Sequence, residues 1–185
     1  MPTQQSDPAE FITLALEQYQ APLIRYATSI LGDPERAREV VQDTFLKLCK
    51  EDLSGVEDHL AQWLFTVCRN RAFDVQRKER RMYPLTAADL DTRPAPGPRP
   101  LAALEREESY RQALTLVEGL PEKEREVIIL KFQCDLSYKE ISAITGHSVS
   151  NVGFLIHTGM KRVRSRVRDE DDAPSPAPVL VRRLP

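Results

Sequence analysis

A proline-rich segment in the middle of the chain sets the strongest limit on how it can fold. Between Pro84 and Pro100 the sequence carries prolines at positions 84, 94, 96, 98 and 100. Proline lacks the backbone donor that a helix needs, and closely spaced prolines favour an extended, semi-rigid chain. We therefore predict a linker over residues 84–102 that joins two folded units, 8–83 and 103–168.

Both units are predicted to be helical. Asp7-Pro8 and Asp33-Pro34 each place an N-cap residue before a proline at the first helical position. Apolar residues recur near helical spacing after each pair, and again from His59 to Arg81. No alternating strand pattern occurs, so the expected fold class is all-α, with two small helical domains.

The apolar positions of the first unit give its candidate core. Pro22 lies inside the first helix and is expected to kink or break it. A polar loop is expected over residues 51–58. The predicted core positions are Phe11, Leu14, Ala15, Leu23, Ala27, Ile30 and Leu31 in the first helix, Val40, Val41, Thr44, Phe45 and Leu48 in the second, and Leu60, Trp63, Leu64, Val67 and Val75 in the third.

Residues 137–168 contain a pattern typical of a helix-turn-helix. Ser137 and Glu140 form a Ser-x-x-Glu capping box, which marks a helix start, and Gly146 suits the left-handed conformation that ends a short helix. After a two-residue turn, Ser148 can cap a longer helix with a basic end. Such a pair can place its second helix in a DNA groove. A plain αα-hairpin would show the same pattern, so the motif alone leaves both interpretations open.

Two basic segments stand out in a chain whose net charge is −2. Residues 61–83 carry six basic and two acidic side chains, and residues 137–168 carry six and one, whereas residues 1–60 carry five and eleven. Two basic segments in an otherwise acidic chain favour two separate contacts with nucleic acid. Two solvated helical faces would give the same charge pattern.

The sequence lacks the motifs of an enzyme, a metal protein or a membrane protein. Cys49, Cys68 and Cys134 are widely spaced, without a Cys-x-x-Cys, so we predict three small core side chains. No phosphate-binding glycine loop or nucleophile motif occurs. No apolar run approaches the ~20 residues that span a bilayer, and no signal-peptide pattern opens the chain. We expect no enzymatic activity, no cofactor, no metal, no membrane insertion and a cytoplasmic location.

Three segments resemble bacterial RNA polymerase sigma factors of the extracytoplasmic-function (ECF) type, in the sigma-70 family. Gly32–Leu46 resembles the family's second conserved region, and Trp63–Arg77 its promoter-melting and downstream-element segment. Leu120–Val127 and the helix-turn-helix resemble its fourth region. The resemblance covers residues 10–82 and 103–168 in the family's order. It implies a protein that binds polymerase core, directs promoter-specific initiation at −10 and −35 type elements, and assists DNA melting.

The resemblance implies roles for residues of the first unit. Glu39, Gln42, Asp43 and Phe45 would dock on the clamp helices of the polymerase β′ subunit. A basic helix face would contact the downstream element and the separated strands through Arg69, Asn70, Arg71, Arg77, Lys78, Arg80 and Arg81, with Asn70 and the 51–58 loop taking a flipped base. Asp74 is expected to pair with neighbouring arginines, and Trp63 to anchor the core rather than stack on a base.

The second unit would bind the flap of the β subunit and read the upstream element in the major groove. We predict base-edge contacts from Ser148, Ser150 and Asn151, and backbone contacts from His157, Lys161 and Arg162. Gly153, Leu155, Thr158 and Met160 stand where many relatives carry basic residues, which predicts weaker upstream affinity. One of Phe154 and Leu155 is expected to face outward, toward a thymine methyl or a protein partner.

The sequence also supports two hypotheses about regulation and one alternative function. An anti-sigma factor that clamps both domains is a hypothesis that rests on the linker and the outward apolar side chain. Residues 169–185 are acidic and proline-rich, and are predicted to be a disordered tail that either competes with DNA or is simply solvated. The alternative function is a stand-alone helix-turn-helix regulator that binds a palindromic operator without polymerase.

Overall fold

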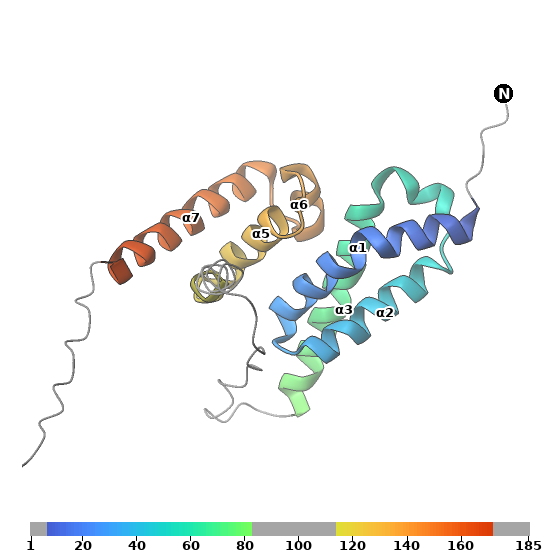
Figure 1. Ribbon diagram of the computed structural model, residues 1–185, viewed down its shortest axis with the longest axis horizontal. Helices are drawn as coiled ribbons and strands as arrows, with labels where there is room; N and C mark the ends of the chain where they lie inside the picture. Colours follow the sequence, from blue (N-terminus) through green and yellow to red (C-terminus); the bar gives the residue numbers. More distant parts are fainter. Residues whose placement is uncertain (1–6, 83–113, 172–185) are drawn as a thin grey trace, which may run out of the picture.

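The computed structural model describes residues 7–82 and 114–171, with side chains to residue 168 (Figure 1). In the first half, α1 spans Pro8–Leu31, α2 spans Pro34–Leu48 and α3 spans Leu60–Met82, and two 3₁₀ turns, η1 (Leu53–Gly55) and η2 (Glu57–His59), precede α3. In the second half, residues 114–118 are helical and are followed by α5 (Glu122–Phe132), α6 (Tyr138–Thr145) and α7 (Val149–Asp171). These residues contain no strand, so the predicted all-α class is confirmed. The predicted linker, 84–102, lies outside the described residues, as does the predicted tail beyond Asp171.

The first two helices begin where the sequence predicts. The Asp7 carboxylate accepts from the backbone N–H of Ala9 at 3.1 Å, and the Asp33 carboxylate accepts from that of Glu35 at 2.8 Å. Gly32 ends α1 with a φ of 72°, a left-handed conformation that costs glycine little. Helix α1 continues through Pro22, so the proline does not end it.

The core of the first half forms where α1, α2 and α3 pack against one another. All five predicted positions of α2, Val40 through Leu48, are buried. Leu14 was predicted to be buried but is 58% exposed, because adjacent helical positions lie about 100° apart and Ala15 takes the inward place. The half-buried side chains of Leu60, Trp63 and Val75 line the edge of this core, so Trp63 packs as the predicted anchor, and Val67 is also half-buried. Cys68 is buried as predicted, and Tyr26, Phe65 and Ala72 are buried without having been predicted.

The second half is built on a close approach of α7 to α5. Val127, Leu130, Ile141 and Val152 fill the space between α5, α6 and α7. A Cβ atom added at Gly159 would lie 2.6 Å from Ile128 Cδ1 and 3.3 Å from Glu124 Cβ, so only glycine fits this crossing unstrained.

The two halves also pack against each other, which the sequence did not indicate. Helix α6 lies against α3, and α5 against the end of α1 (Figure 1). One buried apolar cluster includes residues of both halves, such as Cys68 and Ile141. Polar contacts reinforce it, because Arg25 Nη2 donates to the Gln133 carbonyl at 3.1 Å. The halves therefore form one closed arrangement in this structure.

Candidate nucleic-acid interface

The outer face of α3 carries the first group of predicted DNA-binding residues. Helix α3 starts after the 3₁₀ turns and presents one face to α1 and α2, so its polar positions fall on the other side. Six of the seven predicted side chains are exposed there: Asn70, Arg71, Arg77, Lys78, Arg80 and Arg81. Their charges lie along a single helix, an arrangement that suits the regularly spaced phosphates of a nucleic-acid strand.

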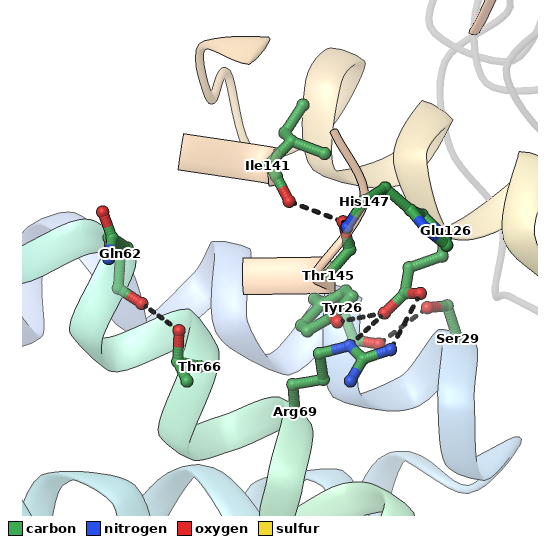
Figure 2. A network of polar contacts seen from close by, with 9 residues as sticks. All are labelled: Tyr26, Ser29, Gln62, Thr66, Arg69, Glu126, Ile141, Thr145 and His147. Carbon is green, nitrogen blue, oxygen red and sulfur yellow. Dashed lines mark hydrogen bonds and ion pairs between the residues drawn. The ribbon is translucent and has the colours of Figure 1, made fainter. Parts of the chain in front are cut away.

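Arg69, the seventh predicted residue, is withdrawn from this exposed face. Its side chain is 24% exposed and forms an ion pair with Glu126 of α5, from Nε to Oε1 at 2.7 Å. Its Nη2 also donates to Glu126 Oε2 at 3.3 Å, and the hydroxyl of Tyr26 donates to Oε1 at 2.7 Å (Figure 2). The guanidinium further lies 4.7 Å from the centre of the Phe73 ring. One carboxylate of the second half is thus held by three donors of the first half.

The electrostatics of this network follow from its burial. Burial raises the pKa of Tyr26 well above its ordinary value, and the neighbouring Glu126 carboxylate adds to the rise. Burial alone would lower the pKa of Arg69, but the hydrogen bond and charge of Glu126 outweigh it, so the net shift is upward. Tyr26 therefore stays a neutral donor and Arg69 a cation at any physiological pH.

A surface hollow continues from this network along α3. It is lined by Phe73, Gln76, Arg77, Arg80 and Arg81 of α3 and by Glu122 of α5. The acidic first turn of α5 therefore lies opposite the basic end of α3.

Two further ion pairs involve predicted residues of the first half. Asp74 pairs with Arg77 on the same helix, as predicted. Arg71 Nη2 lies 2.9 Å from Asp43 Oδ2, so a predicted DNA contact and a predicted polymerase contact are joined to each other. Both side chains of this second pair are about half exposed (52% and 48%), and solvent screening makes the pair weak.

The helix-turn-helix forms as the sequence predicts. Ser137 Oγ accepts from the N–H of Glu140 at 3.3 Å, and Glu140 Oε2 accepts from the N–H of Ser137 at 2.7 Å, so the capping box is complete. Gly146 has a φ of 76°, and Ser148 Oγ accepts from the N–H of Asn151 at 3.2 Å to cap α7. These local contacts set the turn that presents the start of α7.

The predicted residues of α7 lie on its exposed side. Ser148, Ser150, Asn151, His157, Lys161 and Arg162 are all exposed. Arg162 is also engaged within the protein, since its Nε lies 3.2 Å from Oε2 of the buried Glu124. Phe154 is 64% exposed whereas Leu155 packs against the core, so Phe154 is the outward side chain of the pair.

The predicted polymerase-contacting residues of α2 divide into two groups. Glu39, Gln42 and Asp43 are exposed on its outer face. Phe45 is only 6% exposed and belongs to the core of the first half. A polymerase contact at this position would therefore use the surface around Phe45, where Leu46 is 51% exposed.

Two of the three cysteines are at least half-buried, and the third is exposed. Cys68 is buried and Cys134 half-buried, and burial raises the pKa of each thiol to about 12. Cys49 was predicted to be a core side chain but is exposed, because it forms the C-cap where α2 ends.

Within residues 7–82 and 114–171, no cluster of His, Cys, Asp and Glu side chains could hold a metal ion, and no helix is long and apolar enough to cross a membrane.

Comparison with known proteins places both halves in recognised sequence families. The family model "Sigma-70 region 2" matches residues 15–82, and "Sigma-70, region 4" matches residues 110–163. The ECF RNA polymerase sigma factor EcfG of Rhodopseudomonas palustris is 33% identical over 143 residues, which cover 77% of this chain and 75% of EcfG. The ECF RNA polymerase sigma factor SigW of Bacillus subtilis is 27% identical over 163 residues, which cover 82% of this chain and 86% of SigW.

Solved structures share the fold at lower identity. RpoE of Bartonella quintana, in complex with the anti-sigma factor NepR, superposes with a TM-score of 0.62 at 21% identity over 84% of this chain and 96% of RpoE. CnrH, in complex with the cytosolic domain of CnrY, superposes with a TM-score of 0.57 at 22% identity over 86% of this chain and 88% of CnrH.

Proposed function

This chain belongs to the ECF sigma factors of RNA polymerase, and from that membership we propose how its two halves direct promoter-specific transcription. The first half contacts the downstream, −10 type element and helps to open it, and the second half contacts the upstream, −35 type element. The observation that carries this proposal is the pairing of a sigma region 2 match with an exposed basic face on α3 and of a region 4 match with a capped helix-turn-helix.

The face of α3 suits a separated DNA strand. Arg77, Lys78, Arg80 and Arg81 neutralise successive phosphates, and Asn70 carries both a donor and an acceptor for a base edge. Phosphate contacts position a strand and base contacts give it sequence specificity, so Asn70 is the predicted reader of this face.

The start of α7 suits the major groove of duplex DNA. Ser148, which caps the helix, and Ser150 and Asn151 of its first turn are exposed where recognition helices contact base edges. Lys161 and His157, further along the helix, are placed for phosphates, whereas Arg162 is partly neutralised by Glu124. The loss of one free cation here supports the prediction of weak upstream affinity.

Protein partners follow from the remaining surfaces. Glu39, Gln42 and Asp43 on α2 form the proposed contact with the clamp helices of the β′ subunit, and the second half contacts the flap of β. Phe154 is the proposed apolar contact for an anti-sigma factor, the class of partner seen with RpoE of Bartonella quintana. Binding to the polymerase would place the protein's action in the cytoplasm.

Run-off transcription with purified core polymerase tests the function. A set of candidate promoters is transcribed with and without the protein, and opening is followed by the permanganate reactivity of unpaired thymines. We expect promoter-specific transcripts that depend on the protein. An Arg77→Ala, Arg81→Ala double variant should lower opening at least about ten-fold and still bind core. Arg38→Ala, an exposed arginine of α2, is the matched control and should transcribe normally.

Failure to bind core polymerase is the result that would refute the proposal. A protein that does not bind core polymerase, but shifts a palindromic duplex by itself, would be a stand-alone regulator and not a sigma factor in action. Binding to core without a transcript on any template would move the search to other promoters and leave the α3 assignments to the permanganate assay.

A further inference from the structure

The carboxylate of Glu126 is held as a phosphate would be. It receives two hydrogen bonds from one side of the Arg69 guanidinium, at 2.7 and 3.3 Å, and one from the Tyr26 hydroxyl at 2.7 Å. Arginine presents the same pair of donors to carboxylates and phosphates, so a phosphate can be bound by the donors that hold a carboxylate. Both donor residues belong to the first half, and only the anion comes from the second (Figure 2).

Helix α5, which carries Glu126, faces the same surface of α3 that we assign to DNA. Arg69 lies on α3 directly before the exposed residues Asn70 and Arg71. Further along the helix, Glu122 of α5 lines the hollow that Arg77, Arg80 and Arg81 border. A DNA strand along α3 and the acidic first turn of α5 would therefore occupy one space.

We propose that Tyr26 and Arg69 form a phosphate-binding site for a promoter strand, and that Glu126 fills this site while the two halves are closed. The inference rests on the proposed function, since it takes α3 as a DNA-binding face. Separation of the halves removes the Glu126 carboxylate and leaves a partly buried guanidinium and a hydroxyl without their acceptor. A strand phosphate satisfies both donors, so DNA binding and opening favour each other.

The consequence is a self-inhibited free protein. A sigma factor in the closed arrangement keeps one cation of its melting helix, Arg69, neutralised, and sets the acidic first turn of α5 opposite the basic end of α3. Any partner that binds the separated halves shifts the population toward the DNA-binding form. Tyr26 thereby acquires a role in DNA binding that its position inside the core of the first half does not suggest.

The test uses the full-length chain without polymerase. Glu126→Gln keeps the size of the side chain and removes its charge, and Glu17→Gln, an exposed glutamate of α1, is the control for the same change in net charge. Small-angle X-ray scattering measures the radius of gyration, and fluorescence anisotropy measures affinity for a single-stranded oligonucleotide. Glu126→Gln should expand the protein and raise its affinity at least about ten-fold above that of Glu17→Gln. Equal radii and equal affinities for the two variants would overturn the proposal.

A second variant distinguishes a direct contact of Tyr26 with DNA from an effect of Tyr26 on the closure of the two halves. In a Glu126→Gln variant whose radius of gyration has increased, Tyr26 no longer meets residue 126, so adding Tyr26→Phe acts through the DNA site. We expect it to lower affinity for the oligonucleotide several-fold without changing the radius. An unchanged affinity would remove Tyr26 from the site.

A third measurement needs no variant and covers the case in which Glu126→Gln does not fold. Titration of the wild-type protein with the oligonucleotide should increase its radius of gyration as the strand displaces α5. A bound protein that stays as compact as the free one would overturn the proposal. Failure of the proposed function would instead appear as a wild-type protein that does not bind core polymerase, which none of these measurements involves.

Discussion

Two glycines of α7 provide a matched test of the close packing between α5 and α7. Both lie inside the same helix, and both become alanine. A Cβ at Gly153 would meet the Tyr138 ring at 3.6 Å, an ordinary contact, whereas a Cβ at Gly159 would lie 2.6 Å from Ile128 Cδ1. Ile128 is 4% exposed and has little room to move, and Glu124 Cβ, 3.3 Å away, is fixed close to the backbone of α5.

The two substitutions are expected to change the free energy of unfolding by different amounts. Alanine is better than glycine by about 1 kcal/mol in a helix interior, so Gly153→Ala should stabilise the protein by nearly that amount. Gly159→Ala gains the same term but adds an overpacked methyl group, which costs about 1–3 kcal/mol. The helix term cancels between the two variants. Their difference in the free energy of unfolding therefore isolates the packing cost, and Gly159→Ala should be the less stable by about 1–3 kcal/mol.

Guanidinium denaturation followed by far-ultraviolet circular dichroism measures both variants against the wild type. A difference of this size also separates their melting temperatures by roughly 2–4 °C for each kcal/mol in a chain of this length. Equal stabilisation by the two substitutions would refute the reasoning, because it would show that α5 and α7 can move apart at no cost.

Three further changes test other parts of the structure. Ser137→Ala removes the capping oxygen of α6 and should lower the free energy of unfolding by about 1 kcal/mol. Ser137→Thr keeps a capping hydroxyl and is the conservative control. Burial raises the pKa of Cys68 and Cys134 from 9.0 to about 12, so the free energy of unfolding should be highest below pH 9 and fall from there toward pH 12 as the unfolded chain releases thiol protons. A double alanine variant of these cysteines should show a shallower fall, and an identical slope would contradict the assignment. Asp43→Ala breaks the exposed pair with Arg71 and should change stability by less than about 1 kcal/mol, while binding to core polymerase weakens; unchanged binding in a pull-down would remove Asp43 from the polymerase contact.

Local signals in the sequence determined a large part of this protein. The cap-plus-proline pairs fixed the starts of α1 and α2, and the capping box with Gly146 fixed α6 and the turn before α7. These features depend only on residues a few positions apart, so they form independently of how the rest of the chain packs. The resemblance to sigma factors also lies in the sequence alone, because it rests on Gly32–Leu46, on Trp63–Arg77 and on Leu120–Val127 with the helix-turn-helix, in the family's order.

Tertiary structure alone decided how these parts meet. The sequence placed Arg69 on the exposed basic face, but the fold pairs it with Glu126, which is 57 residues away, and joins both to Tyr26, which is 100 residues from Glu126. Helical periodicity records which side of a helix is apolar, not which helix will cover it or which charge will be set against it. The closed contact between the halves, and the anion held inside it, arise only when two distant surfaces are brought together.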